Sequence, residues 1–126
     1  MVAEVRTTVM KLIIAIVRPE RFDAIRAALA EQDVYLMTVT DVHGCGRERA
    51  GPEWYRGTSL ADRTVPKLKL EIAVTDAFVE AAVEAILGAA RTSPTGDIGD
   101  GKIFILPLED CIRIRSGERG GAAIGP

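Results

Sequence analysis

The segment Thr95–Phe104 contains the residue types and spacing most able to do chemistry. Its sequence, TGDIGDGKIF, places three glycines within six positions, directly before Lys102. Glycine is costly to order, so this run predicts backbone with positive φ or a close approach to another group. Glycine amides beside a lysine also offer a phosphate both hydrogen-bond donors and a positive charge. The segment predicts either a phosphate cradle or a tight structural turn. It differs from the usual dinucleotide fingerprint because its loop precedes a strand instead of a helix.

Four basic groups could join this glycine turn at a polyanion. Lys102 follows the turn, and Arg47 follows Gly44 and Gly46. Arg113 and Arg115 lie two residues apart, hence on one face of an extended segment. A planar, permanently charged guanidinium suits phosphate, so convergence of all four groups would form a di- or triphosphate site. The alternative for the last two arginines is the solvated face of an edge strand.

Other side chains carry weaker signals. Glu71 lies between apolar residues of a predicted strand, where a buried carboxylate needs a partner such as an arginine, a base or a ribose. Asp97 and Asp100 are candidates for Mg²⁺, although aspartate is also common in turns. His43 and Cys45 are more typical of structural or surface positions than of catalysis. Since no Ser/His/Asp order, histidine pair or activated cysteine motif occurs, the sequence predicts a protein that is not an enzyme.

Composition indicates one globular domain with a sizeable core. The 126 residues carry a net charge of −2 and are 48% hydrophobic, so nothing favours a nucleic-acid partner. Two widely spaced cysteines suit a reducing cytoplasm, and no apolar run reaches membrane length, so we expect no direct membrane insertion. Because Met10 directly precedes the first apolar run, residues 1–9 are expected to be an N-terminal extension.

The chain contains two similar halves, each with a strand, a helix and a strand. Apolar, β-branched runs predict strands over residues 11–17, 35–42, 67–74 and 103–108. Helical spacing follows Pro19 to about Gln32, and a second helix follows a cap at Thr75 or Asp76. This order predicts an α+β, ferredoxin-like β-α-β-β-α-β fold with both helices on one face of an antiparallel sheet. A short fifth strand is predicted over 112–115, followed by a mobile, glycine-rich tail.

A long connection joins the two halves. Residues 44–66 include four arginines and the only tryptophan. A connection of this length in a small domain is usually functional or disordered. Trp54, Tyr55 and Arg56 are typical of contacts with protein partners, so the sequence favours a partner-binding loop over a passive hairpin.

These motifs together resemble the P-II nitrogen-regulatory signal-transduction family over residues 10–119. The resemblance rests on TGDIGDGKIF followed by IRIRSGE from Ile112, on MTVTDV from Met37 leading to Gly44-x-Gly-Arg47, on Tyr55-Arg-Gly57, and on PKLKLEI from Pro66. It implies a homotrimer with domain limits at 10–119, a partner-binding T-loop over about 46–65 and a flexible tail over 120–126. It also implies that ATP or ADP binds in the clefts between subunits.

The resemblance also implies roles for individual residues. Those expected to bind nucleotide are Ile16, Thr38, Gly44, Gly46, Arg47, Glu71, Ala73, Gly99, Asp100, Gly101, Lys102, Arg113 and Arg115, the last two from the neighbouring subunit. The T-loop would dock on an ammonium channel or a nitrogen-metabolism enzyme. Lys67 would pair with 2-oxoglutarate bound beside Mg-ATP, and Glu48 stands where the family has a metal-coordinating glutamine.

Three departures from the family pattern affect the expected function. Leu60 replaces the tyrosine that many members modify, so that switch is absent. The carboxylate of Glu48 can bind Mg²⁺ but repels a dicarboxylate, which leaves 2-oxoglutarate sensing open. Residues 91–94 lengthen the approach to the glycine turn. The leading prediction is an adenine-nucleotide sensor that regulates nitrogen metabolism, a transporter or an enzyme. The alternatives are a sensor of another metabolite, such as bicarbonate or AMP, and a small phosphate-handling enzyme.

Overall fold

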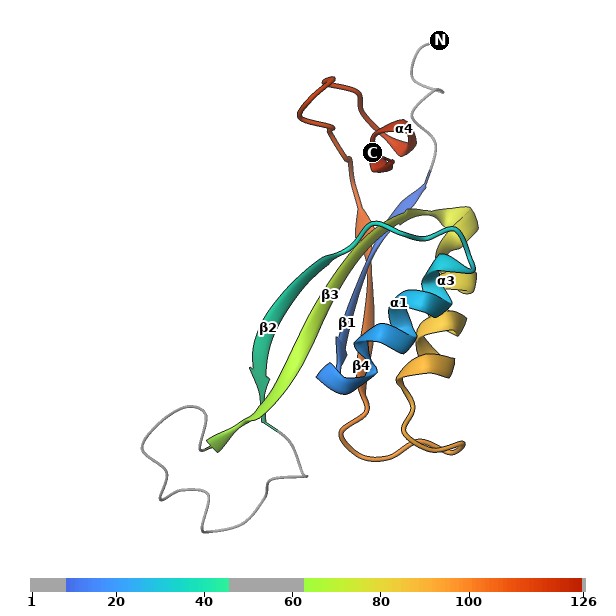
Figure 1. Ribbon diagram of the computed structural model, residues 1–126. Helices are drawn as coiled ribbons and strands as arrows, with labels where there is room; N and C mark the ends of the chain where they lie inside the picture. The colour runs from blue at the N-terminus through green and yellow to red at the C-terminus, as the bar shows by residue number, and fades with distance from the viewer. Residues whose placement is uncertain (1–8, 46–62, 126) are drawn as a thin grey trace.

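A four-stranded antiparallel sheet forms the centre of the protein, with helices on one of its faces (Figure 1). The structure is a computed structural model that describes residues 9–45 and 63–125. Its elements are β1 (Met10–Val17), a 3-10 turn η2 (Pro19–Arg21), α1 (Phe22–Ala30), β2 (Thr38–Gly44), β3 (Val65–Thr75), α3 (Asp76–Ala90), β4 (Gly101–Leu108) and α4 (Gly121–Ile124). The strand order β2-β3-β1-β4 is that of the ferredoxin-like fold, so the predicted fold class is confirmed.

The central position of β1 fixes the register of the sheet. Ile16 pairs with Lys69 of β3 on one side and with Lys102 of β4 on the other. On the far side of β3, Thr38 of β2 pairs with Glu71. The four strands therefore bring residues that are far apart in the sequence into neighbouring rows.

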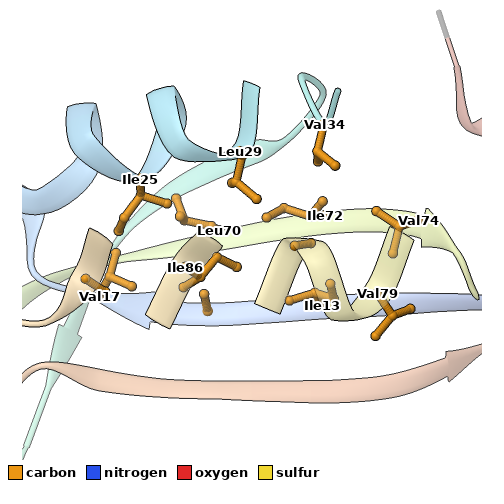
Figure 2. Packing of buried hydrophobic residues seen from close by; sticks show 13 residues of the cluster. Ile13, Val17, Ile25, Leu29, Val34, Leu70, Ile72, Val74, Val79 and Ile86 are labelled. Atoms are coloured by element: carbon orange, nitrogen blue, oxygen red, sulfur yellow. The ribbon is translucent and has the colours of Figure 1, made fainter. Parts of the chain in front are cut away.

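The core lies between the sheet and the two longer helices. Side chains alternate along a strand, so every second residue of β1 and β3 faces α1 and α3. These inward residues are fully or almost fully buried and pack against Ile25, Leu29 and Ile86 of the helices; they are Ile13, Ala15, Val17, Leu70, Ile72 and Val74 (Figure 2). Burial of this apolar surface holds α1 and α3 on one face, and neither of them covers the other face of the sheet.

The uncovered face is apolar along β1 and β4. Phe104 and Leu106 are 49% and 40% exposed, and Leu12, Ile14 and Ile16 of β1 are half-buried on the same face. Large exposed apolar patches are characteristic of interaction surfaces.

Several predicted boundaries differ from the observed ones. The strand predicted over 35–42 begins only at Thr38, because Asp33 has a φ of 62° and the chain turns there while Val34 enters the core. The first helix is divided into η2 and α1. The second begins after Thr75, as predicted, but the Thr75 side chain makes no capping hydrogen bond.

The end of the chain also differs from the prediction. Residues 112–115 do not form a strand, since Ile112 makes one isolated bridge with Arg119 as the backbone reverses. The segment that follows folds back as the short helix α4, in which Ala123 is buried. A glycine-rich composition predicted a mobile tail, whereas Arg113 donates to the carbonyl oxygens of Ala122 and Gly125 and holds the helix in place.

Within residues 9–45 and 63–125, no helix combines the length and the apolar character needed to cross a bilayer.

Candidate functional site

The glycine turn ends where β4 meets the end of β1. Gly101 has a φ of 112°, and a Cβ added to it would lie 1.7 Å from the carbonyl oxygen of Ile16. Gly99 has a φ of 102°. Glycine is therefore required at position 101 for two reasons, a left-handed backbone and a close approach between strands. Lys102 follows directly and is exposed on the helix-free face, beside Ile16.

The Asp100 carboxylate holds the turn together. Its Oδ1 accepts hydrogen bonds from Arg18 Nε at 3.0 Å and from Thr92 Oγ1 at 2.8 Å. Its Oδ2 accepts from the backbone N–H of Asp97 at 2.8 Å and from that of Thr92 at 3.2 Å. Arg18 Nη2 also donates to the carbonyl oxygen of Ile98 at 2.9 Å. Both ends of the loop between α3 and β4 are thus tied to one carboxylate.

These bonds perturb the Asp100 carboxyl group. Burial by itself would raise the pKa of Asp100, but the N–H of Asp97, the hydroxyl and N–H of Thr92 and the Arg18 guanidinium together hold that pKa well below its usual range. The carboxylate is consequently ionised at neutral pH and occupied by four donors. This placement makes Asp100 a support of the turn and argues against its use as an Mg²⁺ ligand.

Lys67 connects the turn to the start of β3. Its side chain is only 6% exposed, and Nζ donates to the carbonyl oxygen of Gly99. The resemblance implies that the Lys67 ammonium group pairs with 2-oxoglutarate. In this structure the same ammonium group binds the glycine turn instead. This hydrogen bond joins the glycine turn directly to the β2–β3 pair.

A cavity of about 410 Å³ lies farther along the same sheet face. We refer to it as the base-end cavity, and its lining residues are Leu12, Leu36, Met37, Thr38, Glu71, Ala73 and Ile124. Thr38 and Glu71 contribute polar groups and the other residues apolar surface, as small-molecule sites usually combine them. Glu71 is half-buried rather than enclosed.

The base-end cavity and the glycine turn are both reached from β3, the cavity at Glu71 and the turn at Lys67. Lys67 and Glu71 are four residues apart on one face of β3, which corresponds to about 13 Å. Ile16 lies between them on the neighbouring strand, opposite Lys69. The structure thus brings together, in one protomer, most of the described residues that sequence analysis assigned to nucleotide.

Arg113 and Arg115 do not join Lys102 in the same protomer. They follow the end of β4, whereas Lys102 lies at its beginning, and Figure 1 shows the C-terminal segment at the opposite end of the sheet from the glycine turn. Arg113 forms an ion pair with Glu118 and binds the tail carbonyls. Within one chain an eight-residue strand separates these groups, so their convergence requires Arg113 and Arg115 of a neighbouring subunit, as the resemblance implies, and stays a prediction.

The remaining candidates are either elsewhere or not described. Gly44 ends β2, away from the base-end cavity. His43 is exposed, with Nδ1 3.1 Å from Thr64 Oγ1, and Cys45 is a free, exposed thiol. The other predicted site residues, Gly46, Arg47, Glu48, Trp54, Tyr55 and Arg56, lie outside the described residues. Within the part of the chain that is described, no three His, Cys, Asp or Glu side chains cluster as metal ligands do.

Sequence reasoning missed Arg18, Thr92 and Ile124. Arg18 lies between the end of β1 at Val17 and Pro19, and the strand pattern alone does not predict its contact with Asp100. Thr92 belongs to the lengthened approach to the turn, so its position was noted but its contact with Asp100 was not predicted. Ile124 lies in the segment that was predicted to be mobile.

Comparison with known proteins places this geometry in a family. A family model described as Nitrogen regulatory protein P-II matches residues 10–118. Nitrogen regulatory protein P-II of Rhodospirillum rubrum is 48% identical over 115 residues, which cover 91% of this chain and 100% of that protein. Nitrogen regulatory protein P-II 1 of Escherichia coli K12 is 47% identical over 115 residues, which again cover 91% of this chain and 100% of that protein. A crystal structure of Arabidopsis thaliana PII bound to citrate is 38% identical with a TM-score of 0.75, and covers 93% of this chain and 91% of its own.

The Gly101→Ala substitution tests the close approach of β4 to β1. We expect the free energy of unfolding to fall by at least about 2 kcal/mol, because the new Cβ meets the Ile16 carbonyl and requires positive φ. Gly88→Ala is the matched control, since a Cβ at this position in α3 has no neighbour within 4 Å and the change should be neutral or stabilise by up to about 1 kcal/mol. Urea denaturation followed by circular dichroism measures both. Equal stabilities of the two variants would contradict the assigned role of Gly101.

The Asp100→Asn substitution tests the anchored carboxylate through its pH dependence. Because the folded-state pKa is lowered, the unfolded state binds the proton first, and the stability supplied by Asp100 is complete above its unfolded pKa of about 3.9. We expect wild type to be more stable than the variant at pH 6, and the difference to shrink as the pH falls below about 4. Asp41→Asn, an exposed position on β2, controls for loss of a surface charge. A difference that does not change with pH would contradict this role.

Proposed function

Because the chain belongs to the nitrogen regulatory protein P-II family, we propose that it is a signal-transduction protein that binds ATP and ADP and reports them to a protein partner. The relatives are named as regulatory proteins, which supports a function other than catalysis. The segment expected to carry the signal is the T-loop over about 46–65.

One observation carries the nucleotide assignment. A cavity with Thr38 and Glu71 in its lining and a glycine turn followed by Lys102 share one face of the sheet, about 13 Å apart along β3. A nucleotide needs these two environments at this separation, an apolar cavity with polar edges for the base and a cationic turn for the phosphates. Neither environment alone would distinguish a nucleotide from a simple anion or an apolar ligand.

At the phosphate end, the backbone of the glycine turn is already fixed before any ligand binds. Asp100 and its donors fix the backbone around Gly99 and Gly101, so little conformational entropy remains to be lost when a phosphate binds. Lys102 supplies an exposed ammonium group, which attracts phosphate as a point charge. If Mg²⁺ accompanies the nucleotide, Glu48 is the side chain that would hold it.

We also propose that three copies assemble through the helix-free face. Phe104 and Leu106 are exposed on it, and β2 and β4 are the two edges of the sheet. Association would bury this apolar surface. It would also bring Arg113 and Arg115 of one subunit toward the glycine turn of the next, which one chain cannot do.

Signalling in this proposal follows from the contact between Lys67 and Gly99. The glycine turn contacts the phosphates, and Lys67 lies at the base of the T-loop, so nucleotides with different phosphate numbers favour different positions of that base. An ammonium channel or a nitrogen-metabolism enzyme is the class of partner proposed. Sensing of 2-oxoglutarate remains an alternative that depends on Glu48, and bicarbonate and AMP are the other candidate effectors.

Calorimetry with ATP, ADP and AMP tests the nucleotide site. We expect wild type to bind ATP and ADP, and Lys102→Ala to weaken ATP binding about 10- to 100-fold, the loss expected for a charge-assisted hydrogen bond. The loss should be smaller for AMP, which has fewer phosphates. Lys11→Ala, at the other end of the sheet, is the control and should leave affinity unchanged. An intact assembly that binds none of the three nucleotides would refute the proposal.

Sedimentation tests the assembly. We expect wild type to have about three times the 13.5 kDa protomer mass, and Phe104→Glu to dissociate, because the change places a charge in the proposed apolar interface. Ala27→Glu is the control, as Ala27 is exposed on α1, on the opposite side of the sheet from the proposed interface. A wild type that sediments as a monomer would rule out the trimer.

A further inference from the structure

We infer that Ile124 of the C-terminal helix α4 forms a wall of the base-end cavity and contacts the base of the bound nucleotide. The inference rests on the proposed function and adds to it a contact from the end of the chain. Ile124 lines the same cavity as Thr38, Glu71 and Ala73, although about fifty residues separate it from β3. Figure 1 shows α4 at the end of the sheet opposite the glycine turn, as a base contact requires.

The segment that carries Ile124 is fixed by contacts on both sides of the chain reversal. The backbone N–H of Gly120 donates to Asp110 Oδ1 at 3.1 Å and to the carbonyl of Cys111 at 2.9 Å. Arg119 forms an ion pair with Asp110 at 2.9 Å. Beyond the reversal, the Arg113 guanidinium binds the carbonyls of Ala122 and Gly125, on either side of Ile124.

Hydrogen bonds from the N–H of Cys111 and Gly120 and the charge of Arg119 hold the pKa of Asp110 below its usual range. The carboxylate is therefore ionised at neutral pH, as its contacts in this clamp require.

Ile124 also separates two cavities. A second cavity of about 290 Å³ lies beside the base-end cavity, with Tyr35 and Phe78 in its lining, and Ile124 lines both. Neighbouring Ala123 is buried, so the helix is seated against the protein. Truncating Ile124 would remove an apolar surface that the two cavities share with Leu36 and Ala73.

The chemistry of the cavity suits the base rather than the phosphates. A purine has apolar faces and polar edges. The branched side chain of Ile124 offers dispersion contacts to a face, while the Thr38 hydroxyl and the Glu71 carboxylate offer hydrogen bonds to an edge or to the ribose. Because the contact is made to the base, its loss should weaken ATP, ADP and AMP equally. This pattern differs from that of Lys102, whose effect depends on the number of phosphates.

Calorimetry of Ile124→Ala with the full-length protein tests the inference. We expect affinity for ATP, ADP and AMP to fall by the same factor, about tenfold. Ile114→Ala is the matched control, because Ile114 belongs to the same C-terminal segment but is almost fully exposed, and its affinities should equal those of wild type. Ile124→Val, which removes one methylene, should lose affinity about two- to threefold and provides the test if the alanine variant does not fold.

The outcomes separate this inference from the proposed function. If wild type binds and Lys102→Ala weakens binding as expected, but both Ile124 variants match wild type, the contact with the base is refuted and the nucleotide site stands. Tighter binding by Ile124→Ala also overturns the inference, because the helix would then exclude the base. A folded wild type that binds no adenine nucleotide refutes both.

Discussion

The helices α1 and α3 both pack on one face of the sheet, and this one-sided packing fixes the register of every strand. Ile13, Ala15 and Val17 of β1 are buried under the helices, so the residues between them must face the other way. A one-residue slip of β1 would place Ile16 in the core and remove it from the row that contains Lys69 and Lys102. Packing of the core and alignment of the candidate site therefore require the same register.

The second requirement is a rigid turn at the end of that register. Gly101 can approach the Ile16 carbonyl only without a Cβ, and Asp100 is held by Arg18, directly after β1, and by donors from the loop after α3. The glycine-rich segment therefore loses its conformational entropy during folding, when the strands pair and the Asp100 carboxylate accepts its hydrogen bonds. Lys67 then connects this rigid turn to the strand that leads out of the long loop.

The sequence predicted the elements well and the contacts between them less well. Alternating and β-branched patterns predict the ends of the four strands to within about three residues. They do so because a strand packed on one face requires apolar side chains at every second position. Tyr35 and Leu36 were assigned to a strand on composition, but Asp33 turns the chain and both residues are exposed. The glycine turn with Lys102 and the Glu71 carboxylate were identified from residue types and spacing, whereas Ile16, Thr38 and Ala73 were found through family motifs. Arg18, Thr92 and Ile124 were not, because their roles depend on contacts across 82, 8 and about 50 residues that no local pattern encodes.

The two ends of the site have different consequences for signalling. A ligand shifts a conformational equilibrium only by the difference in its affinity for the two states. ATP and ADP share their base, so under the proposed function contacts at Thr38, Glu71 and Ile124 would contribute the same free energy to both and could not distinguish them. The distinction must arise where the ligands differ, at the glycine turn, and Lys67 is the described side chain that joins that turn to the start of β3. In the proposed function, the base end would determine which class of nucleotide is bound, and the phosphate end would determine what the T-loop transmits.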